Sequence, residues 1–176
     1  MEVRWHPRWV NVSWVKAIMM LCDAVQVVEG KLYMLGGGWS VIGPDPTPFG
    51  IAMKLDVSWT ELDAPHHWEL FLVDEDGHEV VVETPDGPQP IEMRGDFQLP
   101  RPPELPDGSP VAVPFALNLP GLPLAMGKRF SWRLTIDGDS DPSWELTFMT
   151  RDTVPEMPGF PDGFPPPPQE GGPASS

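Results

Sequence analysis

The sequence predicts an all-β protein, an antiparallel β-sandwich of about nine strands with an immunoglobulin-like or similar arrangement. Three observations support this prediction. Several segments alternate apolar and polar residues with a period of two, which is the pattern of half-buried strands. The 176 residues include 25 Pro and 17 Gly, which interrupt helices and favour turns between short strands. Eight Trp residues provide large apolar side chains for the core of one domain.

The first strand is predicted over residues 17–28, where the sequence "AIMMLCDAVQVV" is apolar on both faces. A strand of this kind is typical of the centre of a sheet, with its second face covered. The dipeptide Glu29-Gly30 is a tight turn that joins it to a second strand over 31–36. The sequence therefore places two central strands at the start of the domain.

Seven further strands follow, separated by Gly, Pro and Asp-rich turns. Alternation is clearest in "IAMKLDVSW" (51–59) and "RFSWRLTID" (129–137), where every second residue is apolar. Pro114 cannot donate to a sheet ladder, so the strand that contains it is expected at an edge or at a bulge. The seven strands are predicted at 49–59, 67–74, 79–83, 91–99, 111–119, 128–137 and 143–150.

Several residues in and after the first strand are of types that can carry chemistry. Asp23 interrupts the apolar run, and we expect it to accept backbone hydrogen bonds at a bulge or to pair with an Arg such as Arg133. The glycines 36–38 are expected to let the chain leave the sheet, because a phosphate-binding loop needs a following helix and "WSVIGPDPTP" cannot form one. Cys22 is flanked by apolar residues and is expected to be buried.

No catalytic constellation is recognisable in the sequence. A Gly-x-Ser-x-Gly nucleophile elbow is missing, and no His or other base stands in a known pattern with the single Cys. The sequence therefore predicts that the protein is not an enzyme and needs no cofactor.

The composition divides the chain into three parts: residues 1–15, 16–151 and 152–176. The first is an arm that contains Trp5, Trp9 and Trp14 with Arg4 and Arg8, the residue types of interface hot spots. The arm docks either on a partner or second copy, or on the sheet of its own domain. The second part is the sandwich domain. The third is rich in Pro and Gly, which predicts a disordered tail, with binding to a proline-recognition groove as the alternative.

The net charge of −15 disfavours nucleic acids and anionic lipid surfaces as partners. No stretch reaches the roughly 20 apolar residues that span a bilayer. The N-terminal region has basic residues before a short apolar run, but no small-residue cleavage site follows. With one Cys in the chain, we expect a cytoplasmic protein.

Several segments resemble a family of short, acidic proteins of unknown function from high-GC Gram-positive bacteria. These segments are "AIMMLCDAVQVVEGKLYMLGGGWS", "PFGIAMKLDVSW", "LFLVDEDG", "LPLAMGKRFSWRLTIDG" and "WELTFMTR". The resemblance covers about residues 16–151 and implies a compact β-sandwich. It transfers no catalytic residue, because none is established for the family.

Two acidic loops are candidates for a cation site. One contains Asp74 and Asp76, and the other contains Asp137, Asp139 and Asp141. If consecutive strands run antiparallel, both loops lie at one end of the sandwich, where closely spaced carboxylates could supply the six to eight oxygens that Ca²⁺ takes. The alternative is structural, since Asp is common in turns because it caps its own backbone.

Two adjacent histidines, His66 and His67, would face opposite sides of a strand, so they cannot form a metal pair by themselves. We expect them at exposed positions near the start of a strand.

Three functions remain open. The first is a non-enzymatic sandwich module that binds a protein partner or associates with itself. The second is a binding module or hydrolase that depends on calcium or another divalent cation held by the acidic loops. The third is a structural component of a phage or secretion-type assembly.

Overall fold

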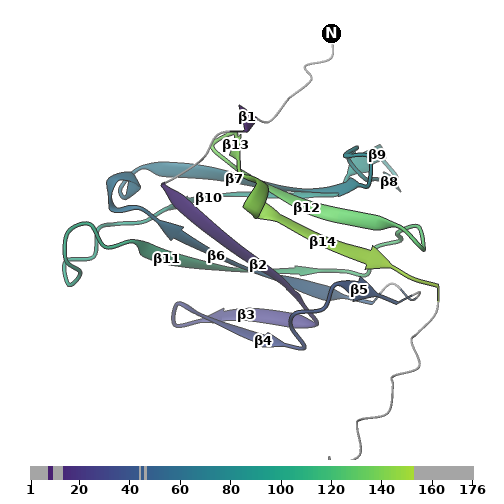
Figure 1. Cartoon of the computed structure of the whole chain (residues 1–176), viewed down its shortest axis with the longest axis horizontal. Coiled ribbons are helices and arrows are strands. Elements are labelled where there is room, and N and C mark those ends of the chain that lie inside the picture. Colours follow the sequence, from purple (N-terminus) through teal and green to yellow (C-terminus); the bar gives the residue numbers. More distant parts are fainter. Residues whose placement is uncertain (1–7, 10–13, 44, 46, 153–176) are drawn as a thin grey trace, which may run out of the picture.

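The structure, a computed structural model, describes residues 8–9, 14–43, 45 and 47–152 of the chain (Figure 1). The all-β prediction is confirmed, because helical structure in these residues is limited to two short 3-10 turns, η1 (Trp59–Glu61) and η2 (Pro142–Trp144). Trp5, Arg4 and the predicted tail beyond Asp152 lie outside the described residues.

The larger sheet is built around two long antiparallel neighbours, β7 and β12. Strand β10 pairs with the other side of β7, and β14 and β13 pair with the other side of β12. The short strands β5 and β1 add in parallel to β14 and β13. The strands are β1 (Arg8–Trp9), β5 (Val41–Ile42), β7 (Pro65–Asp74), β10 (Glu92–Gln98), β12 (Arg129–Ile136), β13 (Asp139–Ser140) and β14 (Glu145–Thr150).

The smaller sheet has three antiparallel strands in the order β11 (Val111–Leu119), β6 (Phe49–Val57) and β2 (Val15–Cys22). Strand β11 pairs only with β6 among the described strands, so the prediction of an edge position for the strand with Pro114 is confirmed. Two hairpins complete the structure, β3 (Ala24–Val28) with β4 (Lys31–Leu35), and β8 (Val81–Thr84) with β9 (Gly87–Pro90).

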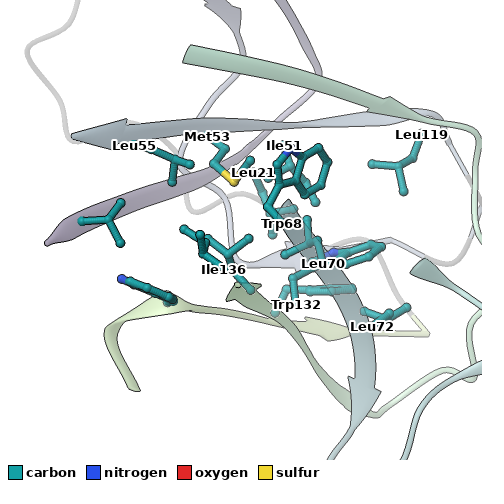
Figure 2. Packing of buried hydrophobic residues seen from close by; sticks show 14 of the residues in the cluster. Leu21, Ile51, Met53, Leu55, Trp68, Leu70, Leu72, Leu119, Trp132 and Ile136 are labelled. Atoms are coloured by element: carbon teal, nitrogen blue, oxygen red, sulfur yellow. The ribbon is translucent and has the colours of Figure 1, made fainter. Parts of the chain in front are cut away.

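The two sheets are stacked, and the β3–β4 hairpin lies on the side of the smaller sheet that faces away from the larger one (Figure 1). Side chains from the facing sides of both sheets form one core (Figure 2). Alternation explains this arrangement, because every second residue of β6 and β12 points into the core. The central buried side chains include Leu21, Ile51, Met53, Leu55, Trp68, Leu70, Trp132 and Ile136, each at most 5% exposed.

The prediction of a single central strand over 17–28 is wrong. The chain bends at Asp23, so β2 and β3 belong to different sheets. Strand β2 pairs only with β6 among the described strands and lies at the edge of the smaller sheet. Its outward side chains Ile18 and Met20 are exposed rather than covered. An apolar pattern on both faces does not distinguish a covered strand from one that leaves an apolar face open.

The turn and glycine segment around this hairpin follow the sequence closely. Glu29 and Gly30 both have positive φ (50° and 71°), which suits a two-residue hairpin turn. Gly36 also has positive φ, and a Cβ there would overlap the carboxylate of Asp23. Asp23 itself is exposed and accepts a hydrogen bond from Trp39 Nε1 at 3.2 Å. The glycines thus let the chain pass close to β2, and Asp23 does not pair with Arg133.

Candidate functional site

The exposed large hydrophobic side chains are concentrated in one short segment. Ten such side chains are exposed among the described residues, and seven of them lie between residues 18 and 35. Single exposed apolar residues are normal, but a concentration of them marks an interaction site. We define the apolar surface as these seven residues of β2, β3 and β4: Ile18, Met20, Val27, Val28, Tyr33, Met34 and Leu35.

The β3–β4 hairpin is held on the smaller sheet through β3. Val25 is buried in a second cluster with Cys22 and Ala52, and Gly50 leaves it room, since a Cβ there would lie 2.8 Å from Val25 Cγ1. The Asn118 amide donates to the Val25 carbonyl at 2.9 Å and accepts from the Val25 N–H at 3.3 Å. Strand β4 is therefore the outer strand of the hairpin, and among the described strands it pairs only with β3.

The apolar surface is divided between the two sides of the hairpin. Met34 lies opposite Val25, so Met34 and Val27 face the same side as Val25, whereas Val28, Tyr33 and Leu35 face away from the smaller sheet. On the side that faces away, the exposed fraction is 50% for Tyr33 and 70% for Leu35. Exposed apolar side chains gathered on one side mark an interaction site.

The segment that carries the apolar surface is also electrically neutral. Residues 15–38 contain two lysines, Lys16 and Lys31, and two acids, Asp23 and Glu29. The whole chain carries −15, so the excess of acid lies entirely in the other residues. A partner that approaches the apolar surface therefore meets less negative charge than elsewhere on the chain.

The outer face of the larger sheet differs in character, although it contains a groove of about 770 Å³. The two arginines that line the groove are already paired: Arg133 Nε lies 2.8 Å from Glu145 Oε1, and Arg94 pairs with Glu92. The sheet register creates the first pair, because Arg133 lies opposite Glu145 on the neighbouring strand, whereas Arg94 and Glu92 lie two residues apart on β10. Cross-strand pairs of opposite charge stabilise a sheet, so Arg133 and Glu145 serve the fold.

The two acidic loops lie at opposite ends of the larger sheet, so the expectation that they share one end is wrong. Strands β7 and β12 are antiparallel neighbours, with Asp74 opposite Phe130 and Trp68 opposite Ile136. The loop after Asp74 is therefore near the start of β12, whereas Asp137 follows its end. Strand β10 is antiparallel to β7, whereas counting the predicted strands makes the segments 67–74 and 91–99 parallel, so the expected directions are already wrong at β10.

Within each loop, the carboxylates cap the backbone. Asp74 Oδ1 accepts from the N–H groups of His78 at 2.8 Å and Asp76 at 2.9 Å, and the His78 bond is the main reason that the pKa of Asp74 is lowered. Asp141 accepts from the hydroxyl and the N–H of Ser143, which lower the pKa of Asp141. These contacts fit the structural alternative for both loops.

One set of possible metal ligands is present in the described residues. Ligand atoms of Asp74, Asp76 and His78 lie within 4.8 Å of one another. The set belongs to one loop and does not include Asp137, Asp139 or Asp141. Asp139 instead lies on β13, opposite Ile136. Calcium binding stays a prediction.

His66 is buried at 5% exposure, so the prediction of an exposed position is wrong for this residue. Its ring stacks on Trp14 at 4.7 Å and contacts Phe97 at 5.1 Å. Nε2 lies 2.9 Å from the Glu61 carbonyl oxygen, which can only accept, and Nδ1 lies 2.7 Å from Asp137 Oδ2. Both ring nitrogens therefore donate when the ring is protonated.

The pKa of His66 reflects these two bonds. Burial acts to lower the pKa, but the hydrogen bonds to Asp137 and to the Glu61 carbonyl outweigh it, so the pKa is raised. His67 points to the opposite face and is half-exposed, with Nδ1 2.7 Å from Asp96 Oδ1. The two histidines thus belong to separate ion pairs, and His66 ties the start of β7 to the end of β12.

Part of the N-terminal arm is docked on its own domain. Arg8 and Trp9 form β1, which pairs with Asp139 and Ser140 of β13. Trp14 stacks on His66, and Val15 is only 2% exposed in the core. The boundary predicted at residue 16 therefore separates two residues from the core against which they pack.

Comparison with known proteins gives a family and nothing more specific. A family of unknown function, DUF6941, matches the chain over residues 17–149. No curated protein and no solved structure matches the chain. In the described residues, no helix is both long and apolar enough to cross a membrane. Since the match covers most of the chain, the protein belongs to DUF6941, a family of unknown function.

Proposed function

We propose that this chain is a non-enzymatic protein-binding module that buries its apolar surface against a partner protein. The observation that supports the proposal is that, among the described residues, seven of the ten exposed large hydrophobic side chains lie on β2 and the β3–β4 hairpin. Removing apolar area from water favours association, and it is the term that must exceed the costs of lost motion and of ordering the interface.

The titratable groups with shifted pKa support a non-catalytic role. Asp74 and Asp141 cap turns, and both nitrogens of His66 are engaged inside the core. Cys22 is fully buried, and burial raises the pKa of its thiol, which disfavours the reactive thiolate. The proposal includes a cytoplasmic location, where a lone Cys stays reduced.

A photocrosslinking experiment tests the proposal. A photoreactive amino acid replaces Leu35 in the full chain, produced in its native cells, and the matched control replaces Val81, which is 56% exposed on the β8–β9 hairpin. We expect a defined protein adduct at position 35 that is missing at position 81. The identified protein is then purified, and its affinity for the wild type and for Leu35→Lys is measured by calorimetry. Equal adducts at both positions, or none at position 35, would reject the proposal.

A cation-dependent module is the second candidate, favoured by the convergence of Asp74, Asp76 and His78. An ion that binds only the native state raises the melting temperature as its concentration increases. We expect this candidate, if correct, to show a calcium-dependent rise that a chelator reverses and that Asp76→Asn removes. An unchanged melting temperature at millimolar calcium rejects it.

A further inference from the structure

The outer edge of β4 carries backbone groups that pair with no other strand in the part of the chain that the structure describes. In a hairpin with a two-residue turn, the residues next to the turn form a hydrogen-bonded pair, here Val28 with Lys31. Alternation then directs the backbone groups of Tyr33 and Leu35 toward β3. The N–H and C=O groups of Leu32 and Met34 point away from the hairpin, toward the open edge. Such an edge can accept another strand.

The edge of β4 also lacks the features that protect other edges of this molecule. Strand β11 carries Pro114 at its edge, and β10, at the edge of the larger sheet, carries Glu92, Arg94 and Asp96. Proline and charged residues hinder the addition of a further strand. In β4, "KLYML", the single charge is Lys31 at the end next to the turn.

Strand β4 is complementary to itself in an antiparallel register centred on Tyr33. In this register Leu32 lies opposite Met34 of a second copy, and both present the outward backbone groups that form a hydrogen-bonded pair. Tyr33 lies opposite Tyr33 of the second copy in a non-hydrogen-bonded pair, where side chains are closest. Lys31 lies opposite Leu35, so no like charges face each other.

The charge distribution favours a second copy as the partner at this edge. Two copies of a chain with a charge of −15 repel each other, but residues 15–38 have no net charge. The neutral hairpin therefore lets two copies approach with less repulsion than through their acidic regions. An isologous interface of this kind forms a closed dimer with twofold symmetry.

We infer that two copies of the chain join through their β4 strands into one four-stranded sheet, with Tyr33 on the twofold axis. This inference rests on the proposed function, because it identifies a second copy as the protein partner of the hairpin. Val28, Tyr33 and Leu35 share the side of the hairpin that faces away from Val25 and the smaller sheet. In the dimer, cross-strand contacts such as that of Tyr33 with the Tyr33 of the second copy cover part of the apolar area on this side.

The first test is the mass of the full chain in solution, measured by light scattering and sedimentation over a range of concentrations. We expect a dimer that dissociates on dilution. Tyr33→Lys places two lysines opposite each other on the axis and should be monomeric wherever the wild type is a dimer. The matched control Val81→Lys adds the same charge to the other hairpin and should stay dimeric. A monomeric wild type, or equal dimerisation of both variants, overturns the inference.

The second test does not depend on the loss of a contact. In Tyr33→Cys, the two cysteines should face each other across the axis and form an intermolecular disulfide under mild oxidation. The native Cys22 is fully buried and does not interfere. Val81→Cys is the control and should stay uncrosslinked. A Tyr33→Cys chain that stays a monomer on oxidation overturns the inference.

The two proposals fail in different ways. If photocrosslinking at Leu35 gives an adduct with another protein while the chain is monomeric, the proposed dimer is wrong, but the proposed binding of a partner protein is supported. If position 35 gives no adduct and the chain is monomeric, both proposals are wrong.

Discussion

The outward faces of the two sheets differ in composition, although strand alternation produces both faces. The outer face of the larger sheet carries charged side chains, among them the cross-strand pair of Arg133 and Glu145. The outer face of the smaller sheet is apolar at β2 and supports a hairpin with exposed side chains such as Tyr33 and Leu35. The first face is stable in contact with water, whereas the second gains free energy when another surface covers it. The difference indicates which face binds.

The largest expected effect comes from a substitution at the start of β7, in the larger sheet. His66→Ala removes the ring between Trp14 and Phe97 and leaves Asp137 without its buried partner. We expect the free energy of unfolding to fall by about 3 kcal/mol, measured by chemical denaturation. His67→Ala is the control and should cost much less, because His67 is half-exposed. A loss for His66→Ala as small as that of the control contradicts the structural role of this ion pair.

The next effect concerns the attachment of the hairpin. Asn118→Ala removes both hydrogen bonds to the backbone of Val25, so we expect a loss of about 1–2 kcal/mol and a looser hairpin. The rate at which a thiol reagent modifies Cys22 should rise, since Cys22 is buried beneath β3. Ser131→Ala removes the hydroxyl contact with Thr147 on the other face and should leave this rate unchanged. An unchanged rate in Asn118→Ala would show that Asn118 does not hold the hairpin.

A smaller effect is expected from pH. The folded-state pKa of His66 is raised above its unfolded value of about 6.5, so the native state binds the proton more tightly. Its stabilisation is complete below about pH 6.5 and is lost as the pH rises through the folded-state pKa. Chemical denaturation should show that the free energy of unfolding falls between about pH 6 and pH 9. The fall should be smaller in His66→Gln than in His67→Gln. Equal slopes in the wild type and His66→Gln would contradict the assignment.

The smallest effect is expected on the polar face. Glu145→Ala removes the partner of Arg133 at a position in partial contact with water, so we expect a loss of less than about 1 kcal/mol. The association of two chains should not change, because this face is remote from β4. Sedimentation of Glu145→Ala beside Tyr33→Lys measures the contrast. If Glu145→Ala also abolished association, the binding face would be assigned to the wrong side.

The sequence predicted the elements with regular alternation and clear turns. The strand over 111–119 has the predicted bounds, and Pro114 lies at an edge as its missing N–H requires. Strand β9, "GPQP", was missed because two prolines and a glycine hide a strand from any periodicity. Strands β10 and β12 are both antiparallel to β7, which the count of predicted strands did not give, so the acidic loops lie at opposite ends. Long-range pairing, such as that of His66 with Asp137, leaves no local pattern in the sequence.

The sequence did not predict this candidate site. Its interaction residues were expected in the arm of residues 1–15, and the apolar pattern of residues 17–28 favoured a covered central strand. Whether a second layer covers an apolar face depends on where the rest of the chain packs, and here the hairpin covers only part of the smaller sheet. Pattern alone therefore could not show that apolar side chains of β2 and of the hairpin are exposed.

The position of the β3–β4 hairpin also determines how many binding faces a dimer would present to a ligand. It lies beyond the smaller sheet, on the side opposite the larger one (Figure 1). Two chains joined at their hairpins would hold their larger sheets at the two outer ends of the assembly. Any weak ligand of that outer face would then be presented in duplicate, and a ligand with two matching sites would gain avidity without a single new contact.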